Sequence, residues 1–352
     1  MALNDLRKQI DDIDSEIVRL LGERFRVVAQ VREEKAQSDA PIYDPAREAM
    51  LLRRICEMRA DPLPIPALRA IYQEILSASR AFQALKVAYL GPPLTNSYLA
   101  ALKQFGTSAY LVPCRTVEDI FDVTERGEAH VGIVPIENSV NGIVAETCDC
   151  LVETPLRVCL ETYVPIHHAL LSKCRLEDVK IVFSHPQVFA QSREWLRDNL
   201  PNVEQVASSS TAAAARQASR EEYAAAIAPS ISAEPYALNI LAENIEDRPD
   251  NRTRFFVVGQ SDSSPSGRDK TSIVFAASHR PGSLHDALSP LDRHGINMTL
   301  IQSRPAHAQL WEYVFFVDFL GHVSDPEITQ ALDDLRQSCL NLKVLGSYPA
   351  AE

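Results

Sequence analysis

Residues 6–36, LRKQIDDIDSEIVRLLGERFRVVAQVREEKA, carry apolar side chains at alternating spacings of three and four. The apolar stripe comprises Leu3, Leu6, Ile10, Ile13, Ile17, Leu20, Val27 and Val31. This spacing is typical of a long helix that packs along one side in a helical bundle. The sequence therefore predicts a helix from about Leu3 to the break at 38–41, and a helical region over residues 1–85.

Two cations interrupt the apolar stripe. Arg24 occupies a position that the spacing assigns to the core, and Lys35, eleven residues later, returns to nearly the same face. A buried, unpaired guanidinium costs several kcal/mol, so both cations are expected to face an anion. The anion is either a ligand or an acidic side chain of a neighbouring helix. A third alternative, that both side chains reach solvent, stays open.

Arg7 lies 17 residues before Arg24. That separation is about 26 Å along a helix, so one small ligand cannot touch both side chains of the same helix. An antiparallel second copy of the helix could bring Arg7 of one subunit to Arg24 of the other. The spacing therefore indicates a homodimer, or a higher homo-oligomer, with shared sites.

Two further polar clusters lie on the second and third expected helices. Asp44, Arg47 and Glu48 share one face at spacings i, i+3 and i+4. Ser79 and Gln83 form an i, i+4 pair among apolar residues of the third helix. Each cluster alone is a weak signal, but with Arg7 and the two cations they make eight polar positions over three helices.

Over residues 1–85 the chain resembles the all-helical chorismate mutase domain, with IYDPAREAMLLRRI (42–55) and ILSASRAFQ (75–83) as further matching segments. The rearrangement of chorismate to prephenate is intramolecular, so the protein has to hold a folded conformer and stabilise charge on the ether oxygen. The resemblance implies that Arg24 and the partner subunit's Arg7 clamp the carboxylates, Lys35 and Gln83 donate to the ether oxygen, Glu48 holds the ring hydroxyl with the help of Arg47 and Asp44, and Ser79 assists a carboxylate.

Residues 86–260 show a different pattern of apolar residues. Short apolar strands, KVAYL (86–90), VGIVPI (131–136), KIVFS (180–184) and RFFVVG (254–259), alternate with helical stretches. Polar segments are expected where strands end and helices begin: GPPLTNS (91–97), ENSVNG (137–142), SHPQVFAQ (184–191) and SSSTAAAA (208–215). Such junctions present backbone N–H groups and hydroxyls that suit carboxylates, although ordinary N-capping explains any single one.

With NRTRF (251–255), these segments resemble prephenate dehydratase over residues 86–260. The resemblance implies two α/β lobes with a cleft between them, like type-2 periplasmic binding proteins, and conversion of prephenate to phenylpyruvate without a metal or cofactor. Thr253 is the first choice for the proton donor, and Glu137 is the alternative. The other implied substrate contacts are Thr95, Asn138, Ser139, Ser184, Gln191, Ser210 and Thr211.

The loop after the first strand departs from the family pattern. The family usually reads G-P-x-G-T followed by an aromatic residue, whereas this chain has Leu94 in place of the glycine and Asn96 in place of the aromatic. If position 94 requires a positive φ, leucine is strained there or the loop is rebuilt. An alternative function is therefore a chorismate mutase fused to an inactive or repurposed dehydratase-like binding domain.

The segment SDSSPSGRDK (261–270) is predicted to be a polar linker. After it, residues 270–352 suggest the order strand, helix, strand, strand, helix, strand of a small α+β domain. PGSLHDAL (281–288) and QSRP (302–305) resemble the motifs of the ACT regulatory domain, which bind phenylalanine at a subunit interface. The effector-binding positions implied are Gly282, Ser283, Leu284, Gln302, Ser303, Arg304 and Pro305.

The family motifs read GAL and ESRP, so Ser283 replaces an alanine and Gln302 replaces a glutamate here. A glutamate holds an ammonium group by a charge-assisted bond that an amide cannot supply. We therefore expect weak phenylalanine binding or a different ligand. The alternative is an ACT-like domain that serves dimerisation alone.

The bulk composition is that of a globular multidomain enzyme, with 352 residues, 46% hydrophobic and 23% charged. A net charge of -12, the lack of a basic run and the lack of a membrane-length apolar stretch argue against nucleic acid and membranes as partners. The charged N-terminus is not a secretory signal, and seven scattered cysteines suggest reduced thiols in a cytoplasmic protein.

The chain as a whole resembles bifunctional chorismate mutase–prephenate dehydratases of phenylalanine biosynthesis. No G-x-G-x-x-G follows a strand, so a dehydrogenase fused to the mutase is not expected. Two other functions stay open. One is a sensing protein that binds metabolites without turnover, and the other is a mutase for an amino-substituted chorismate, because Glu48 could hold an amine as well as a hydroxyl.

Overall fold

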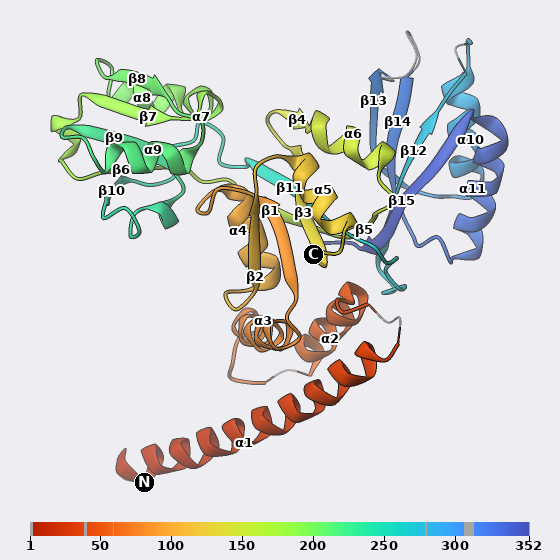
Figure 1. Ribbon diagram of the computed structural model, residues 1–352, viewed down its shortest axis with the longest axis horizontal. Coiled ribbons are helices and arrows are strands. Elements are labelled where there is room, and N and C mark those ends of the chain that lie inside the picture. Colours follow the sequence, from red (N-terminus) through yellow and green to blue (C-terminus); the bar gives the residue numbers. More distant parts are fainter. Residues whose placement is uncertain (1–2, 39–40, 59, 279, 306–312, 352) are drawn as a thin grey trace.

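The computed structural model describes residues 3–38, 41–58, 60–278, 280–305 and 313–351. The chain forms a helical part, a two-lobed α/β part and an α+β part, in the order that the sequence predicts (Figure 1). Within the described residues no helix combines the length and the apolar character needed to cross a membrane.

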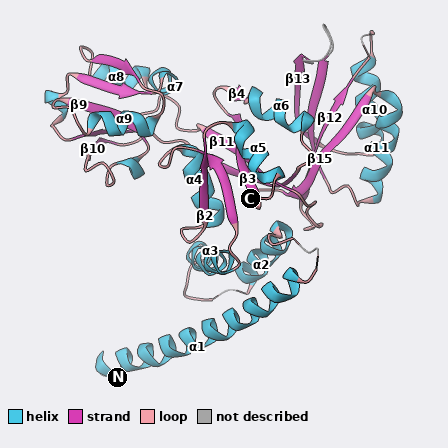
Figure 2. Cartoon of the chain, in the orientation of Figure 1, coloured by secondary structure: helices cyan, strands magenta, loops and turns pink. Residues whose placement is uncertain are grey.

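Three helices make up the N-terminal part: α1 (Leu3–Ala36), α2 (Pro45–Glu57) and α3 (Ile65–Phe82). The second begins where Asp44 accepts a hydrogen bond from the backbone N of Arg47 at 3.0 Å and Pro45 occupies the first helical position. The C-terminal half of α1 lies beside α2 and α3, and its N-terminal half extends away from the rest of the molecule (Figures 1 and 2).

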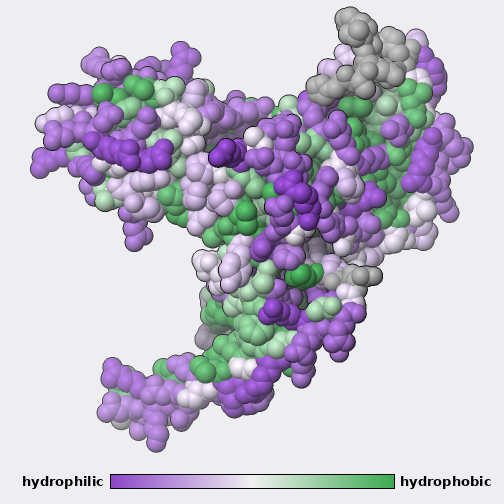
Figure 3. Space-filling view, in the orientation of Figure 1, coloured by the Kyte–Doolittle hydropathy of each residue, from purple (hydrophilic) through white to green (hydrophobic). Residues whose placement is uncertain are grey.

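The long first helix is confirmed, but its apolar stripe finds no partner within the described part of the chain. No residue of α1 is buried, and Leu3 is 63% and Val31 42% exposed. Figure 3 shows apolar surface along the side of α1 near its middle. A stripe of this length is more than a monomer normally leaves in contact with water.

The first α/β lobe is a mixed sheet in the order β2-β1-β3-β11-β5, with β4 attached to β3. Its first three strands are parallel, and β11 runs antiparallel to both of its neighbours. Its elements are β1 (Lys86–Leu90), α4 (Asn96–Phe105), β2 (Tyr110–Cys114), α5 (Val117–Glu125), β3 (Val131–Asn138), β4 (Gly142–Ile143), α6 (Ala145–Glu153), β5 (Arg157–Pro165) and β11 (Arg252–Gly259).

The second lobe is inserted between β5 and β11, so the chain crosses between the lobes twice. Its sheet has the order β10-β6-β9-β7-β8. Every residue of the central strand, AAAIA, is buried, and the small side chains let the alanine-rich helix α9 pack closely on it. The elements are β6 (Ala169–Ser172), η1 (Leu176–Asp178), β7 (Ile181–Ser184), α7 (Pro186–Gln191), α8 (Arg193–Asn199), β8 (Glu204–Ala207), α9 (Thr211–Ala218), β9 (Ala224–Ala228), η2 (Ser230–Ser232) and β10 (Asn239–Ala242).

The C-terminal part has the predicted order of strands and helices, and its sheet β13-β14-β12-β15 is antiparallel throughout. One face of this sheet is covered by the two helices through Ile273, Phe275 and Phe319 (Figure 1). Residues of opposite pleat, among them Val274 and Phe316, join the core of the first lobe. The elements are β12 (Asp269–Ala276), α10 (Ser283–Arg293), β13 (Met298–Pro305), β14 (Tyr313–Leu320), α11 (Pro326–Ser338) and β15 (Asn341–Pro349).

One local expectation was wrong. ENSVNG (137–142) is not a junction between a strand and a helix, because β3 continues through Asn138 and a turn leads into β4. The turn forms because Asn138 Oδ1 accepts from the backbone N of Val140 and of Asn141, at 3.1 and 3.0 Å. The predicted linker 261–270 runs from the end of β11 into the start of β12. It is also held to the helical part, because Ser266 O accepts from Arg53 Nη1 of α2 at 3.1 Å.

Candidate active sites

The first cluster of polar residues lies where α1 meets α3. Arg24 Nη1 donates to Ser79 Oγ at 2.6 Å, and Ser79 Oγ in turn donates to the carbonyl of Ile75 at 2.8 Å. Partial burial lowers the pKa of Arg24, while Tyr72 and Glu48 oppose that shift. Arg24, which interrupts the apolar stripe, therefore points toward a polar group of the helical part, the Ser79 hydroxyl.

Lys35, Asp44 and Glu48 extend this cluster toward α2. Lys35 Nζ donates to the carbonyl of Ile42 at 3.0 Å. Burial lowers the pKa of Lys35, and the carboxylates of Asp44 and Glu48 act against that shift. Two cations, two carboxylates and one hydroxyl thus lie within electrostatic reach of one another, which is an arrangement suited to a small polar anion.

The side chains of the other three predicted mutase residues are not joined to this cluster in the described structure. Arg7 lies in the exposed N-terminal half of α1, and Arg47 is exposed on the first turn of α2. Gln83 is the residue after α3 and ends that helix, whereas the sequence placed it inside. One chain therefore brings together five of the eight positions.

Sequence reasoning missed Arg80, which is the partner of Glu48. Arg80 Nη1 lies 2.6 Å from Glu48 Oε2, and Arg80 is only 6% exposed. The signal was present in the sequence, because Arg80 follows buried Leu76 by four residues and so continues the inner face of α3.

In the two-lobed part, the predicted dehydratase residues of β3 and β11 meet. Thr253 lies opposite Asn138 in the register of the two strands, and Asn138 Nδ2 donates to Thr253 Oγ1 at 2.9 Å. The same amide reaches Asn251 Oδ1 at 2.9 Å. Ser139 Oγ accepts from the backbone N of Arg252 at 3.0 Å, so the two motifs are joined at both side-chain and backbone level. Glu137 precedes Asn138 and is partly buried.

The predicted residues of the second lobe mostly form hydrogen bonds with other residues of that lobe. Ser184 is fully buried and its Oγ donates to the carbonyl of Ile227 at 2.8 Å. Gln191 Oε1 lies 2.8 Å from Nε2 of buried His168. Ser210 caps α9 by accepting from the backbone N of Ala213 at 3.1 Å, and Thr211 opens that helix.

The first loop has the conformation that leucine disfavours. Leu94 has φ +70°, in the left-handed region. Its carbonyl accepts from Ser232 Oγ of the second lobe at 3.5 Å. Thr95 precedes α4 but does not cap it with its side chain, because Thr95 Oγ1 donates to the carbonyl of Pro92 at 3.0 Å. Asn96 begins the helix.

The predicted effector positions form two groups in the α+β part. Gly282, with φ +82°, precedes α10, and Ser283 and Leu284 open that helix. The second group lies at the end of β13, where Gln302 Nε2 donates to the carbonyl of Ser303 at 3.3 Å. Arg304 turns toward the first lobe and forms an ion pair with Asp149 of α6 at 3.1 Å, and Pro305 ends the strand.

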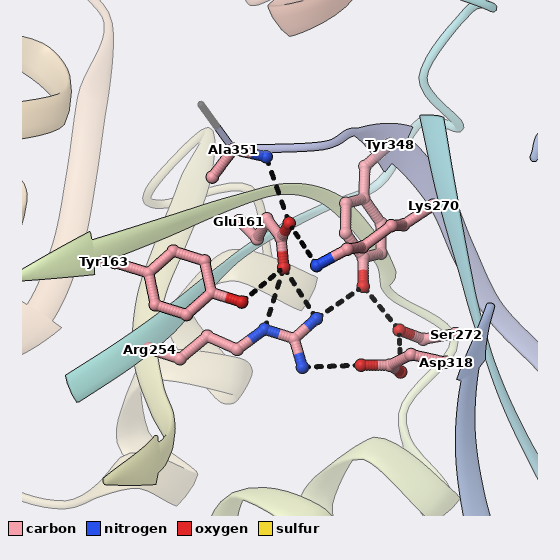
Figure 4. Close-up of polar contacts among 8 residues, drawn as sticks. All are labelled: Glu161, Tyr163, Arg254, Lys270, Ser272, Asp318, Tyr348 and Ala351. Atoms are coloured by element: carbon pink, nitrogen blue, oxygen red, sulfur yellow. Dashed lines mark hydrogen bonds and ion pairs between the residues drawn. The ribbon is translucent and has the colours of Figure 1, made fainter. Parts of the chain in front are cut away.

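A buried charge network joins the first lobe to the α+β part (Figure 4). Arg254, the residue after Thr253, is paired with Glu161 at 2.7 Å and with Asp318 at 2.5 Å. Lys270 Nζ lies 2.8 Å from Glu161, and Tyr348 Oη accepts from Arg254 at 3.0 Å. Two cations thus balance two carboxylates at the boundary.

Comparison with known proteins gives three matches in the order of the three parts. Family models described as chorismate mutase type II, prephenate dehydratase and ACT domain match residues 6–84, 87–263 and 271–337. A bifunctional chorismate mutase/prephenate dehydratase of Aquifex aeolicus is 43% identical, over 99% of this chain and 98% of that protein.

Two solved structures resemble the chain beyond its helical part. A prephenate dehydratase from Arthrobacter aurescens in complex with L-Phe has a TM-score of 0.70 and 37% identity, over 76% of this chain and 90% of that one. A protein described as a quorum-quenching acylase has a TM-score of 0.69 and 28% identity, over 76% and 98%. One scaffold thus carries different described activities, so the fold alone does not decide the chemistry. Identity of 43% over nearly the whole of both chains, with all three family models in order, does decide the family: this chain belongs to the bifunctional chorismate mutase/prephenate dehydratases.

Proposed function

We propose that this chain converts chorismate to prephenate in its helical part and prephenate to phenylpyruvate in its two-lobed part, as an enzyme of phenylalanine biosynthesis. The full-length similarity to a bifunctional relative supports both steps. The structural observation that carries the proposal is the joining of predicted residues from distant motifs, Arg24 with Ser79 and Asn138 with Thr253.

In the mutase reaction the protein supplies geometry and charge and takes no part covalently. Arg24 and the partner subunit's Arg7 hold the two carboxylates. Lys35 and Gln83 donate to the ether oxygen, on which negative charge grows as the bond breaks. The remaining residues hold the ring hydroxyl and a carboxylate: Glu48 with Arg47 and Asp44, and Ser79.

The exposed stripe of α1 supports a homodimer. Leu3, Ile10, Ile13 and Val27 are each more than half exposed, and the other four residues of the stripe are 42–49% exposed. A second α1 laid antiparallel would cover these side chains and bring the partner subunit's Arg7 toward Arg24. The half-site that one chain assembles would then be completed by its partner.

In the dehydratase reaction, prephenate loses its ring hydroxyl as water and its ring carboxylate as carbon dioxide. The electrons of the breaking C–C bond restore the aromatic ring, and the departing hydroxyl takes up one proton. Thr253 delivers that proton, with Asn138 fixing its hydroxyl, and Glu137 is the alternative donor. The residues proposed to bind prephenate are Thr95, Asn138, Ser139, Ser184, Gln191, Ser210 and Thr211.

Phenylalanine is the proposed effector of the ACT domain, because a related dehydratase was solved with L-Phe. Its site comprises Gly282, Ser283, Leu284, Gln302, Ser303, Arg304 and Pro305. All seven cysteines are free thiols, which supports a reducing compartment such as the cytoplasm.

The test separates the two activities in one protein. Lys35→Ala is expected to abolish chorismate turnover and to leave prephenate turnover unchanged, whereas Thr253→Ala is expected to do the reverse. Lys8→Ala, at an exposed position of the same helix, is the control for the first variant. Near-normal mutase turnover in Lys35→Ala would contradict the mutase assignment.

The strained Leu94 favours one second candidate, a mutase fused to a dehydratase-like domain without activity. The wild-type chain decides between the two: formation of phenylpyruvate from prephenate without any cofactor establishes the dehydratase. Failure to form it, with chorismate still consumed, would establish the second candidate.

A further inference from the structure

Arg80 connects the mutase cluster to the neighbouring domain. Its Nη1 lies 2.6 Å from Glu48 Oε2, and its Nη2 donates to the carbonyl of Phe105 at 2.9 Å and, at 3.4 Å, to that of Gln104. These two carbonyls end helix α4, where unpaired carbonyl groups carry partial negative charge. One guanidinium therefore joins a carboxylate of α2 to the first α/β lobe.

The fork of the guanidinium fits this double role. Arg80 is 6% exposed, and its guanidinium carbon lies 5.8 Å from the centre of the Phe105 ring. A planar fork can meet a carboxylate and two carbonyls in one fixed orientation, which a lysine ammonium on a flexible stem cannot. Glu48 is thereby held in one direction on the inner side of α2.

The position of Arg80 is set by a close junction between α3 and α4. Gly106, with φ +79°, ends α4, and a Cβ built there would lie 2.3 Å from the side chain of Ser77. Ser77 Oγ also accepts from the backbone N of Ser108 at 3.2 Å, and Thr107 Oγ1 donates to Glu74 at 3.1 Å. The first α/β lobe therefore fixes the end of α3 from which Arg80 projects.

Arg80 also affects the pKa of Glu48. Burial raises the pKa of the Glu48 carboxyl, and Arg80 is the largest influence that lowers it. Asp44 acts with burial and Lys35 against it. The other charged or titratable groups facing Glu48, directly or across the cavity it lines, are Arg24 of α1, Tyr43, Arg53 of α2, Arg69 of α3, Lys103 of α4, and Glu161 and Tyr163 of β5.

We propose that Arg80 is a positioning residue of the mutase reaction, which holds the Glu48 carboxylate toward the ring hydroxyl of chorismate and is itself held by the end of α4. This inference rests on the proposed mutase function. It also means that the mutase site is completed by a contact from the dehydratase domain of the same chain.

The test compares mutase kcat/KM over pH 5.5–9 in the full-length wild type, Arg80→Gln and Arg80→Lys, with exposed Arg54→Gln as the matched control. Glu48 has to be ionised to accept from the hydroxyl, so activity falls as pH falls through its pKa. Loss of the adjacent cation raises that pKa, and the acid limb of Arg80→Gln is expected to move up by about one pH unit, a tenfold loss on that limb. Arg54→Gln should follow the wild type.

Glu48→Gln supplies the internal check. Without a titrating carboxyl its profile should lack this acid limb, and adding Arg80→Gln should cause no further pH shift. Prephenate turnover of each preparation reports whether the chain is folded. If Arg80→Gln does not fold, Arg80→Lys decides. The inference is supported if the acid limb of its kcat/KM profile stays near that of the wild type, because the charge is kept, while the plateau value of kcat/KM falls, because the fork is lost.

Two results would overturn the positioning role. One is an unchanged profile in Arg80→Gln. The other is an equal loss at every pH in Arg80→Gln, which removes the charge, because that is what a purely structural ion pair gives. Absence of chorismate turnover in the wild type would instead show that the proposed mutase function itself is wrong.

Discussion

Arg254 of β11 and Asp318 of β14 form an ion pair of 2.5 Å across the boundary between the dehydratase domain and the ACT domain, and each is 3% exposed. Arg254 follows Thr253, so the strand that carries the proposed proton donor is anchored in the regulatory domain. Glu161 holds the same guanidinium from the dehydratase side at 2.7 Å (Figure 4). The two domains therefore share one buried electrostatic core.

The first prediction concerns the stability of this boundary. Asp318→Asn keeps the size of the side chain but leaves Arg254 and Lys270 facing one carboxylate. Breaking a buried pair from one side typically costs about 3–5 kcal/mol. We expect a loss of about 3 kcal/mol in the free energy of unfolding, measured by urea denaturation with circular dichroism.

The matched control is Asp333→Asn. Asp333 pairs with Arg336 one turn along α11 at 2.7 Å, but both side chains are more than half exposed. An exposed pair of this kind contributes about 0.3–0.5 kcal/mol. Equal effects of the two substitutions would show that burial of the Arg254–Asp318 pair is not what stabilises the boundary.

The second prediction concerns Leu94. A left-handed backbone costs a residue with a Cβ about 1–2 kcal/mol, while glycine adopts it freely but loses more entropy on folding. Leu94→Gly is therefore expected to raise the free energy of unfolding by up to about 1 kcal/mol. Leu94→Ala keeps the strained backbone and should not stabilise. A gain in alanine equal to that in glycine would show that the side chain, and not φ, is the source of strain.

Much of the fold was predictable because its signals are local. The spacing of apolar residues gave α1, and the strands at 86–90, 131–136, 180–184 and 254–259 all form. The expectation of a strand–helix junction at ENSVNG (137–142) was wrong. The side chain of Asn138 closes a turn within three residues, which a search for strand–helix junctions does not detect.

The parts that could not be predicted depend on contacts between distant segments. Arg80 pairs with Glu48, 32 residues away in the sequence, and Arg254 pairs with Asp318, 64 residues away. Each arginine directly follows a residue that was predicted to belong to a site: Arg80 follows Ser79, and Arg254 follows Thr253. A sequence shows that such a charge lies on an inner face, but its partner depends on how distant segments pack, within one domain for Arg80 and between two domains for Arg254.

The third prediction is a pH dependence of stability at His168. Burial lowers the pKa of this imidazole below its ordinary value, and Gln191 and Glu246 offset part of that shift. The unfolded chain therefore takes up a proton first as the pH falls below about 6.5, and stability decreases from there toward the lowered folded-state pKa.

In His168→Gln, which keeps a donor toward Gln191, the decrease in the urea midpoint between pH 7.5 and pH 5.5 should be smaller than in the wild type. His285→Gln is the control, because the His285 side chain is 86% exposed. An identical pH dependence in His168→Gln and the wild type would exclude His168 as the titrating group.

The last prediction concerns the effector. Gln302 lies at the end of β13, where its amide donates to the carbonyl of Ser303 at 3.3 Å and offers no charge to an ammonium group. Gln302→Glu adds a carboxylate of nearly the same shape, and a hydrogen bond to a charged group contributes about 1 kcal/mol more than a neutral one. Calorimetry should then show phenylalanine binding about five- to tenfold more tightly, since 1.4 kcal/mol corresponds to a factor of ten. Gln330→Glu, at an exposed position of α11, adds the same charge away from the motif and should not change the affinity. Unchanged binding in Gln302→Glu would place the phenylalanine ammonium elsewhere in the ACT domain.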